Sequence, residues 1–307
     1  MKFIHGHDLQ QHASALDGWQ QHYQQLTPGK FMGALFDIWL ADVRLFREYL
    51  NLKVVQHMSL AAPNVNLVIP LQNDILLGNI PTCSGIAVLP YGVQHFSLIS
   101  GNQMDVLCIS LPPARFLSLM PGGAALLTPT GYHITLPPLM LDNLRRQCNA
   151  MIHYLQHLPA RQHTDSLMAL LRDQLLDTLR ETLASIPPAA VARLGYTTRH
   201  YIVARCHQWV QDGQPGEITP DMLCRQLKIS RRTLQYSFQQ VTGLSPVAYL
   251  RAIRLNLARS SLLNTPAEPV AAIARRAGFH HCGYFASEYG ALFGETPSQT
   301  RALAAHR

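Results

Sequence analysis

The hydrophobic pattern of the first part of the chain changes at about residue 31. Before it, apolar positions around Trp19 and Tyr23 predict a short helix over residues 15–26, at the end of an N-terminal arm over residues 1–30. Across residues 31–120, short apolar runs alternate with turn-forming Pro, Gly, Asn and Asp, which predicts a β-rich region. Such strands are typical of a small barrel or sandwich, and a barrel mouth commonly holds one small ligand.

Leucine dominates the part of the chain that follows. Residues 121–138 are rich in Gly and Pro and predict a loop, whereas residues 139–185 contain two helical patterns with leucine on one face. This helix pair can cover the predicted barrel, or it can pair with the same helices of a second chain. The Pro- and Gly-containing stretch after it predicts a linker over residues 191–198.

Helical periodicity continues through residues 199–307, and the clearest helix lies within residues 230–243. Ser230 can cap this helix with its hydroxyl, and Gly243 can end it in the left-handed conformation. Its apolar face contains Leu234, Phe238 and Val241, and its polar face contains Arg231, Arg232, Gln235 and Gln239. A shorter helix and a three-residue turn precede it, so the pattern predicts a helix-turn-helix unit.

A second unit of the same kind follows a long predicted helix that begins at Ser245 and Pro246. Its last helix has three aromatic residues on one face and leaves His281, Tyr284 and Ser287 toward the other. A helix with an apolar back and an Arg/Gln front suits the major groove of DNA. Arg can bond O6 and N7 of guanine together, and Gln can bond N6 and N7 of adenine.

The charge of the chain supports a nucleic-acid partner for this part. The formal net charge is +7, and residues 196–307 contain 13 Lys and Arg against 6 Asp and Glu, a difference of +7. Residues 1–195 contain 12 of each and are neutral. A neutral domain followed by a basic one indicates a polyanion partner for the second.

Other features of the sequence exclude several classes of protein. The six cysteines contain no Cys-x-x-Cys pair, which favours free thiols in a reducing cytoplasm over a disulfide frame or a zinc site. The first residues lack a signal-peptide core, and no apolar run is long enough for a membrane span. No phosphate-binding glycine loop or nucleophile elbow is present, so we expect no catalytic residues and no metal.

The C-terminal third resembles the DNA-binding domain of the AraC/XylS family of bacterial transcription regulators. The matching motifs occur in the same order as in the family, at residues 230–235 (SRRTLQ), 243–246 (GLSP), 249–255 (YLRAIRL), 277–279 (AGF) and 293–297 (FGETP). The resemblance implies seven helices with two helix-turn-helix units joined by a long helix. It also implies that their recognition helices enter successive segments of the major groove.

The same resemblance indicates which residues contact DNA. In the first unit it points to Arg231, Arg232, Thr233 and Gln235, and Gln239 lies on the same face. In the second unit it points to His281, Gly283, Tyr284 and Ser287. The family usually has serines at the positions of His280, His281 and Gly283, and often a basic residue at Ser287. The base preference of the second unit therefore stays open, and the two histidines can equally form a solvated turn.

The first sixty residues are similar to the sensor domain of activators of ethanolamine-utilisation operons. The matching segments are GWQQ at residues 18–21, PGKF at 28–31 and FREY at 46–49. This resemblance implies an amine or amino-alcohol effector such as ethanolamine, with adenosylcobalamin as a possible co-effector and no cofactor that is required.

An amine effector would need a carboxylate or aromatic faces around its buried ammonium. Asp37 and Glu48 are acidic residues within apolar segments, and together with Phe36, Trp39 and Tyr49 they are the predicted effector-binding residues. Two alternatives remain open. Asp37 can lie on an exposed strand face, and Glu48 can form a salt bridge with Arg47 or Arg44.

We interpret the chain as an α+β protein of two domains. Residues 1–190 form an effector-sensing and dimerisation domain with a cupin-like β-barrel and a helix pair, and residues 199–307 form an all-α DNA-binding domain. The predicted function is a homodimeric transcription activator in the cytoplasm, with double-stranded DNA, RNA polymerase and a small effector as partners. The alternatives are a repressor of the same family and a cupin-type enzyme fused to a DNA-binding domain.

Overall fold

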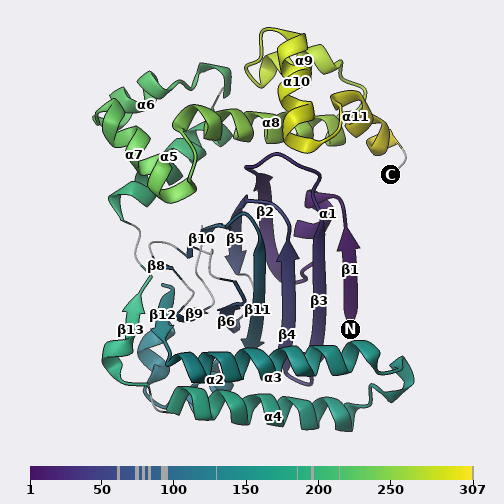
Figure 1. Ribbon diagram of the computed structural model, residues 1–307, viewed down its shortest axis with the longest axis vertical. Coiled ribbons are helices and arrows are strands. Elements are labelled where there is room, and N and C mark those ends of the chain that lie inside the picture. The colour runs from purple at the N-terminus through teal and green to yellow at the C-terminus, as the bar shows by residue number, and fades with distance from the viewer. Residues whose placement is uncertain are drawn as a thin grey trace. The chain divides into compact units, whose positions relative to one another are not determined.

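The computed structural model describes the chain except for residues 61–62, 73–75, 78–79, 82–83, 91–95, 129, 185, 195–196, 214 and 306–307. Cys83, one of the six cysteines, and His95 lie outside the described residues. The chain divides into two compact units (Figure 1). The first contains Met1–His22, Met32–Asn51 and Gln56–Gly195, and the second contains Tyr23–Phe31, Leu52–Val55 and Tyr196–Arg307.

The β-rich region consists of two sheets. In the eight-stranded sheet every neighbouring pair is antiparallel, and the order is β1 (Lys2–Gly6), β3 (Gly33–Leu40), β4 (Val43–Leu50), β11 (Met104–Leu111), β6 (Val65–Pro70), β9 (Gly85–Leu89), β12 (Tyr132–Thr135) and β13 (Val191–Arg193). The five-stranded sheet has the order β2 (Trp19–Gln25), β5 (Val54–Leu60), β10 (Phe96–Ile99), β7 (Leu76–Leu77) and β8 (Ile80–Pro81). No closed barrel is formed by the described strands, so the cupin-like barrel is not confirmed.

The N-terminal arm differs from the prediction. Residues 19–25 form strand β2 rather than a helix, because Trp19, Gln21 and Tyr23 also share one face at the two-residue period of a strand. The helix of this region is α1 (Leu9–Ala13), which Asp8 caps by accepting a hydrogen bond from the backbone N–H of Gln11 (2.9 Å). Strand β1 pairs with β3, so the first residues belong to the sheet.

Two predicted loops also contain regular structure. Residues 121–138 include a short 3-10 helix, η2 (Gly123–Leu126), and strand β12. The predicted linker over residues 191–198 begins with β13, and helix α5 starts at Thr198. Pro and Gly marked these segments as irregular, but pairing with an existing sheet edge extends regular structure into short segments that have little propensity of their own.

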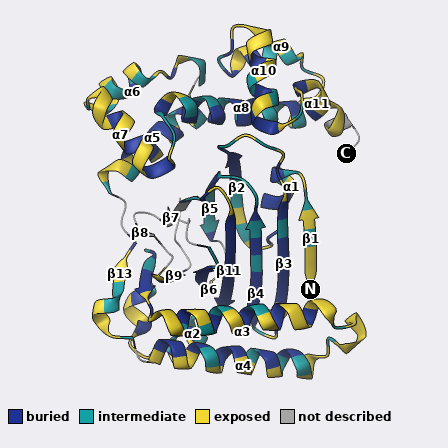
Figure 2. Ribbon diagram, in the orientation of Figure 1, coloured by how far each residue is buried: buried dark blue, intermediate teal, exposed yellow. Residues whose placement is uncertain are grey.

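The leucine-rich helix pair packs within the chain. Helices α3 (Pro138–His157) and α4 (Asp165–Ala184), with the shorter α2 (Pro113–Leu119), contribute to the same buried core as one face of the eight-stranded sheet. Phe36 and Leu45 on the sheet and Leu144 and Leu179 on the helices are fully or almost fully buried in it. Figure 2 shows the outer faces of α3 and α4 as exposed. The intramolecular alternative for this pair is thus confirmed.

Helices make up the C-terminal domain, and their bounds follow the sequence closely. They are α5 (Thr198–Asp212), α6 (Pro220–Leu227), α7 (Arg231–Thr242), α8 (Pro246–Asn264), α9 (Val270–Arg276), α10 (Cys282–Phe293) and α11 (Pro297–Ala305). Thr197, Thr219, Ser230 and Ser245 each cap the helix that follows by accepting a backbone N–H of its first turn. Within the described residues, none of the helices combines the length and hydropathy needed to cross a membrane.

Candidate nucleic-acid interface and interior of the β-rich region

The ends of helix α7 are fixed by the residues that the sequence indicated. The hydroxyl of Ser230 accepts a hydrogen bond from the backbone N–H of Thr233 (3.0 Å), and Gly243 ends the helix with φ of 72°. Lys228, in the turn between α6 and α7, also has a positive φ of 53°. A tight turn of this kind sets the angle between the two helices of a helix-turn-helix unit.

The two faces of α7 differ as predicted. Leu234, Phe238 and Val241 are buried, and the ring of Phe238 packs on Tyr249 of α8 with 5.2 Å between centroids. The five predicted DNA contacts are all exposed: Arg231, Arg232, Thr233, Gln235 and Gln239. Burial raises the pKa of Tyr249, whose hydroxyl lies 2.9 Å from Nδ1 of His207. The apolar back of the recognition helix is thereby held on a buried and uncharged support.

Arg231 has a partner that the sequence analysis did not identify. Its guanidinium forms a bidentate ion pair with Asp221 of α6, with 2.6 Å between Nε and Oδ1. The hydrogen bonds to Asp221 raise the pKa of Arg231. Asp221 lies in the first turn of α6, ten residues before Arg231, and neither helical periodicity nor a local motif links the two. Arg232, by contrast, has no carboxylate partner among the described residues.

The second recognition helix, α10, has the same division of faces. Phe285, Tyr289 and Phe293 are buried and their rings stack in sequence, with 5.5 Å and 4.6 Å between consecutive centroids. The predicted contacts all lie in the exposed class: His281, Gly283, Tyr284 and Ser287. A Cβ added to Gly283 would meet no atom within 4 Å, so the serine that is usual in the family would fit at this position.

In the β-rich region, Asp37 is part of a buried ion pair. Both Asp37 and Arg44 are about 4% exposed, and Arg44 binds the two carboxylate oxygens at 2.6 and 2.7 Å. Arg44 also donates to the carbonyl of Asp17 (2.6 Å) and lies over the rings of Trp39 and Phe46. The alternative that Asp37 lies on an exposed face is wrong. Because Arg44 already satisfies this carboxylate, Asp37 is a poor counter-ion for an amine.

Glu48 lies on the same face of the sheet, toward the five-stranded sheet. Its Oε1 lies 2.9 Å from Nε2 of His12, and both side chains are buried. Neither predicted arginine partner is involved, since Arg47 pairs with Asp105 and Arg44 pairs with Asp37. Glu48 borders a small interior space of about 30 Å³ together with Trp19, Phe46, Gln56, Met58 and Cys108. This volume is enough for about one water molecule.

The sheet separates the other predicted effector residues. Phe36 faces the helix-covered core, and Tyr49 alternates with Glu48 and so also points away from the interior between the sheets. Trp39 is 49% exposed. Of the five predicted effector-binding residues, only Asp37 and Glu48 are buried on the face of the eight-stranded sheet that points toward the five-stranded sheet. His12 was missed because it lies on a helix where the sequence had indicated none.

No group of three or more His, Cys, Asp or Glu side chains within the described part of the chain is arranged to hold a metal ion. Five cysteines are described, and all are free. Burial raises the pKa of Cys148 to about 12 and that of Cys108 further, so these interior thiols stay protonated.

Taken together, two exposed recognition helices on a basic helical domain define a DNA-binding regulator with paired helix-turn-helix units. A helix-turn-helix domain model matches residues 223–303. The XylDLEGF operon transcriptional activator 2 of Pseudomonas putida is 32% identical over 127 residues, which are 41% of this chain and 78% of that protein. The transcriptional activator RhaS of Escherichia coli is 34% identical over 93 residues, 30% of this chain and 33% of that protein.

Part of this chain is also similar to a solved structure. A probable AraC family transcriptional regulator from Rhodopseudomonas palustris is 34% identical, covering 34% of this chain and 97% of that chain with a TM-score of 0.31. This chain belongs to the AraC/XylS family of helix-turn-helix transcriptional regulators. Its relatives are regulators rather than enzymes, so the alternative of a cupin-type enzyme has no support. The comparisons also give no support to the likeness between the first sixty residues and ethanolamine-operon activators, which stays a prediction.

Proposed function

We propose that this chain activates transcription by reading two successive major-groove segments of one DNA site under the control of a small effector. The observation that carries the proposal is the exposure of nine predicted contact residues on α7 and α10, whose opposite faces are buried. Arg232 and Gln235 are the best placed to read bases, because Arg recognises guanine and Gln recognises adenine. Arg231 can also read a base once its guanidinium leaves the ion pair with Asp221 or divides its hydrogen bonds between Asp221 and the base.

Selection from a random duplex pool tests the DNA-binding part of this proposal. The purified chain should enrich one motif with two sub-sites about one helical turn apart. A reporter gene placed behind that motif should then be expressed more strongly with the chain than without it. A decrease would instead identify a repressor, and failure to enrich any motif would refute sequence-specific binding.

For the effector, we propose a small amine or amino alcohol bound beside Glu48. The support is chemical: Glu48 is a buried carboxylate with a histidine at 2.9 Å and aromatic neighbours, which suits a cation. The space beside it holds about 30 Å³, so an effector must select a more open arrangement of the sensor. Such a second arrangement is what an effector-dependent switch needs.

A thermal-shift screen of the full chain tests this effector class. Ethanolamine, other amines, neutral alcohols and cobalamins are compared, since a ligand that binds the native state raises the melting temperature. We expect amines to stabilise the wild type but not Glu48→Gln, which keeps the shape and removes the charge. Stabilisation by neutral alcohols alone, or an unchanged amine response in Glu48→Gln, would contradict the proposal. A response to adenosylcobalamin would identify it as a co-effector.

We further propose that the chain acts as a homodimer through the outer face of α3 and α4, and that it contacts RNA polymerase when bound to DNA. Three large apolar side chains on this helix pair are exposed: Leu139 (82%), Leu170 (64%) and Tyr154 (47%). Large exposed apolar patches mark interaction surfaces, and in a dimer these three side chains would contribute to one. Sedimentation of the wild type and of a Leu139→Glu/Leu170→Glu variant tests the dimer, which the variant should lose.

A further inference from the structure

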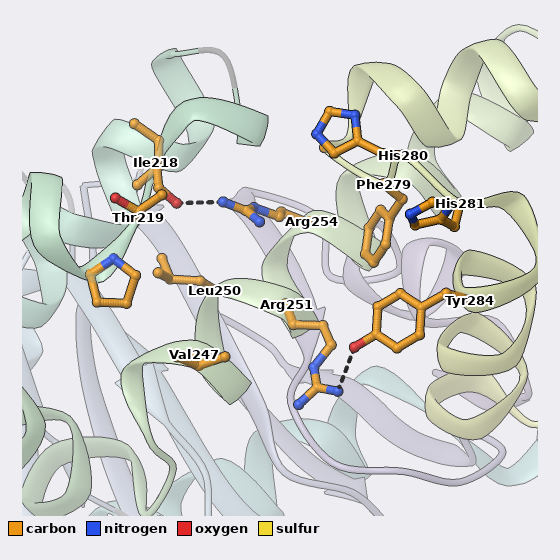
Figure 3. A pocket seen from close by; sticks show the side chains of 12 residues that line it. Ile218, Thr219, Val247, Leu250, Arg251, Arg254, Phe279, His280, His281 and Tyr284 are labelled. Carbon is orange, nitrogen blue, oxygen red and sulfur yellow. Dashed lines mark hydrogen bonds between the residues drawn. The ribbon is translucent and has the colours of Figure 1, made fainter.

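A cavity of about 380 Å³ lies between the two helix-turn-helix units of the C-terminal domain (Figure 3). One wall is formed by residues 218–220 at the start of α6, and the opposite wall by residues 278–281 and Tyr284 of the second unit. Side chains of α8, including Val247 and Arg254, line it between these walls. The cavity therefore contacts both units and the helix that joins them.

Two arginines line this cavity, and their charges are balanced differently. Arg251 forms an ion pair with Glu288 (2.6 Å) and also donates to the hydroxyl of Tyr284 (3.2 Å). Arg254 has no carboxylate partner among the described residues. It donates through Nη2 to the carbonyl of Ile218, and its buried Nε has no hydrogen-bond partner there.

Burial lowers the pKa of Arg254, which means that the site disfavours its charge. An arginine nevertheless stays protonated at neutral pH. A partly buried cation without a counter-ion is stabilised by an anion that enters the cavity beside it. The start of α6 at the same wall adds the positive end of a helix dipole, which favours the same charge.

The cavity adjoins the DNA-reading surface. His281 and Tyr284, which are predicted to contact DNA from α10, also line the cavity. When two recognition helices enter successive major-groove segments, the sugar–phosphate backbone between those segments passes the region that joins the two units. The cavity is situated in that region of the domain.

We infer that this cavity receives one phosphodiester of the DNA strand between the two major-groove segments, with Arg254 as the cation that binds it. The inference rests on the proposed function and adds a positioning contact to it. Such a contact carries no sequence information but fixes where the domain lies along the duplex. The apolar side chains of Ile218, Val247, Leu250 and Phe279 at the cavity suit the deoxyribose groups on either side of the phosphate.

Salt dependence of binding provides the test. The full chain is titrated with its selected duplex and with a scrambled duplex over a range of salt concentrations. Each neutralised phosphate contributes about 0.9 to the slope of log K against log salt. We expect Arg254→Met to lower that slope by about one and to weaken both duplexes by the same factor. Arg205→Met, which removes a charge outside the cavity, should leave the slope unchanged.

A second variant covers the possibility that Arg254→Met fails to fold. Val247 is 58% exposed and lines the cavity, so Val247→Phe fills the space without changing charge or the buried core. It should lower the slope as Arg254→Met does. A slope equal to that of the wild type in Val247→Phe, or a slope in folded Arg254→Met equal to that in Arg205→Met, would overturn the inference.

Methylphosphonate substitution locates the phosphate on the DNA. A neutral linkage at one position between the two sub-sites should weaken the wild type and have no further effect on Arg254→Met. Absence of such a position would overturn the inference, whereas failure of the wild type to select any duplex would refute the proposed function itself. Thermal melting with inorganic phosphate at constant ionic strength distinguishes DNA phosphate from a free anion. The site would belong to a free anion if phosphate raised the melting temperature of the wild type but not of Arg254→Met, while Arg254→Met left the salt slope of DNA binding unchanged.

Discussion

Arg231 at the start of recognition helix α7 is bound by Asp221 in the first turn of α6, with 2.6 Å between Nε and Oδ1. Both side chains are more than half exposed, so solvent screens the pair and its contribution to stability is small. Its consequence is therefore for recognition rather than for folding. The carboxylate orients the guanidinium and at the same time offsets a charge that DNA would otherwise attract.

From this pair we predict that Asp221→Asn strengthens binding to DNA of any sequence and reduces discrimination. The substitution removes one negative charge from the interface and frees Arg231, which can then reach phosphates. Anisotropy titrations with the selected and the scrambled duplex measure both effects. The affinity for scrambled DNA should rise more than that for the selected duplex, and Glu217→Gln, which removes a charge from a neighbouring segment, is the control. A gain confined to the selected duplex would show that Asp221 does not orient Arg231.

Arg232 allows a direct test of base reading because it has no carboxylate partner among the described residues. If it reads guanine, Arg232→Ala should cost about 1–3 kcal/mol on the selected duplex and relax the base preference at one position. Repeated selection with the variant reveals that position. An equal loss on all sequences with a shallower salt slope would assign Arg232 to a phosphate instead.

The Asp37–Arg44 pair leads to a prediction about the stability of the β-rich region. Both side chains are almost fully buried, so removing one leaves the other as an uncompensated charge in the interior. We expect Arg44→Met to lower the free energy of unfolding by about 3–5 kcal/mol, measured by chemical denaturation. The double variant Asp37→Leu/Arg44→Met should recover most of that loss, since neither charge remains. If the double variant is as unstable as the single one, the pair is not the cause.

The C-terminal domain was predictable from sequence to a degree that the β-rich region was not. Around α7, the cap at Ser230, the glycine at Gly243 and the apolar spacing of Leu234 and Phe238 are all local signals that agree with one another. In the β-rich region the decisive contacts are between residues that are distant in the sequence. His12 and Glu48 are 36 positions apart, and their pairing depends on a sheet whose strand order the sequence does not state.

The error at residues 19–25 has a related cause. Trp19 and Tyr23 are four residues apart, a spacing that fits both the helical and the strand period. Pairing within a sheet determines that this segment is a strand. Asp221 could have been noticed as an acidic residue in the first turn of α6, but its contact with Arg231 follows from the crossing of two helices. Cap residues and periodicity predict where single helices and strands lie in the sequence. Contacts between residues of different helices or strands depend on the tertiary fold and do not follow from local patterns.

His133 on β12 provides a prediction about pH. It is buried beside Ala87 of β9 and Ala192 of β13, its Nε2 has no partner among the described residues, and burial lowers its pKa from the ordinary value of 6.5. The unfolded chain therefore binds a proton at a higher pH than the native chain does. The contribution of His133 to the free energy of unfolding is therefore constant above about pH 6.5. Below that pH the contribution falls as the solution is acidified, by at most about 1.4 kcal/mol per pH unit.

The variant His133→Phe isolates this contribution, because it keeps an aromatic ring and removes the titration. Urea unfolding of both proteins at a series of pH values gives the difference between their free energies of unfolding. We expect that difference to be independent of pH above about 6.5 and to change in favour of the variant as the solution is acidified. His22, whose pKa burial also lowers, is present in both proteins and cancels in the comparison. A difference that stays constant through the acidic range would mean that His133 is protonated equally readily in the folded and unfolded states.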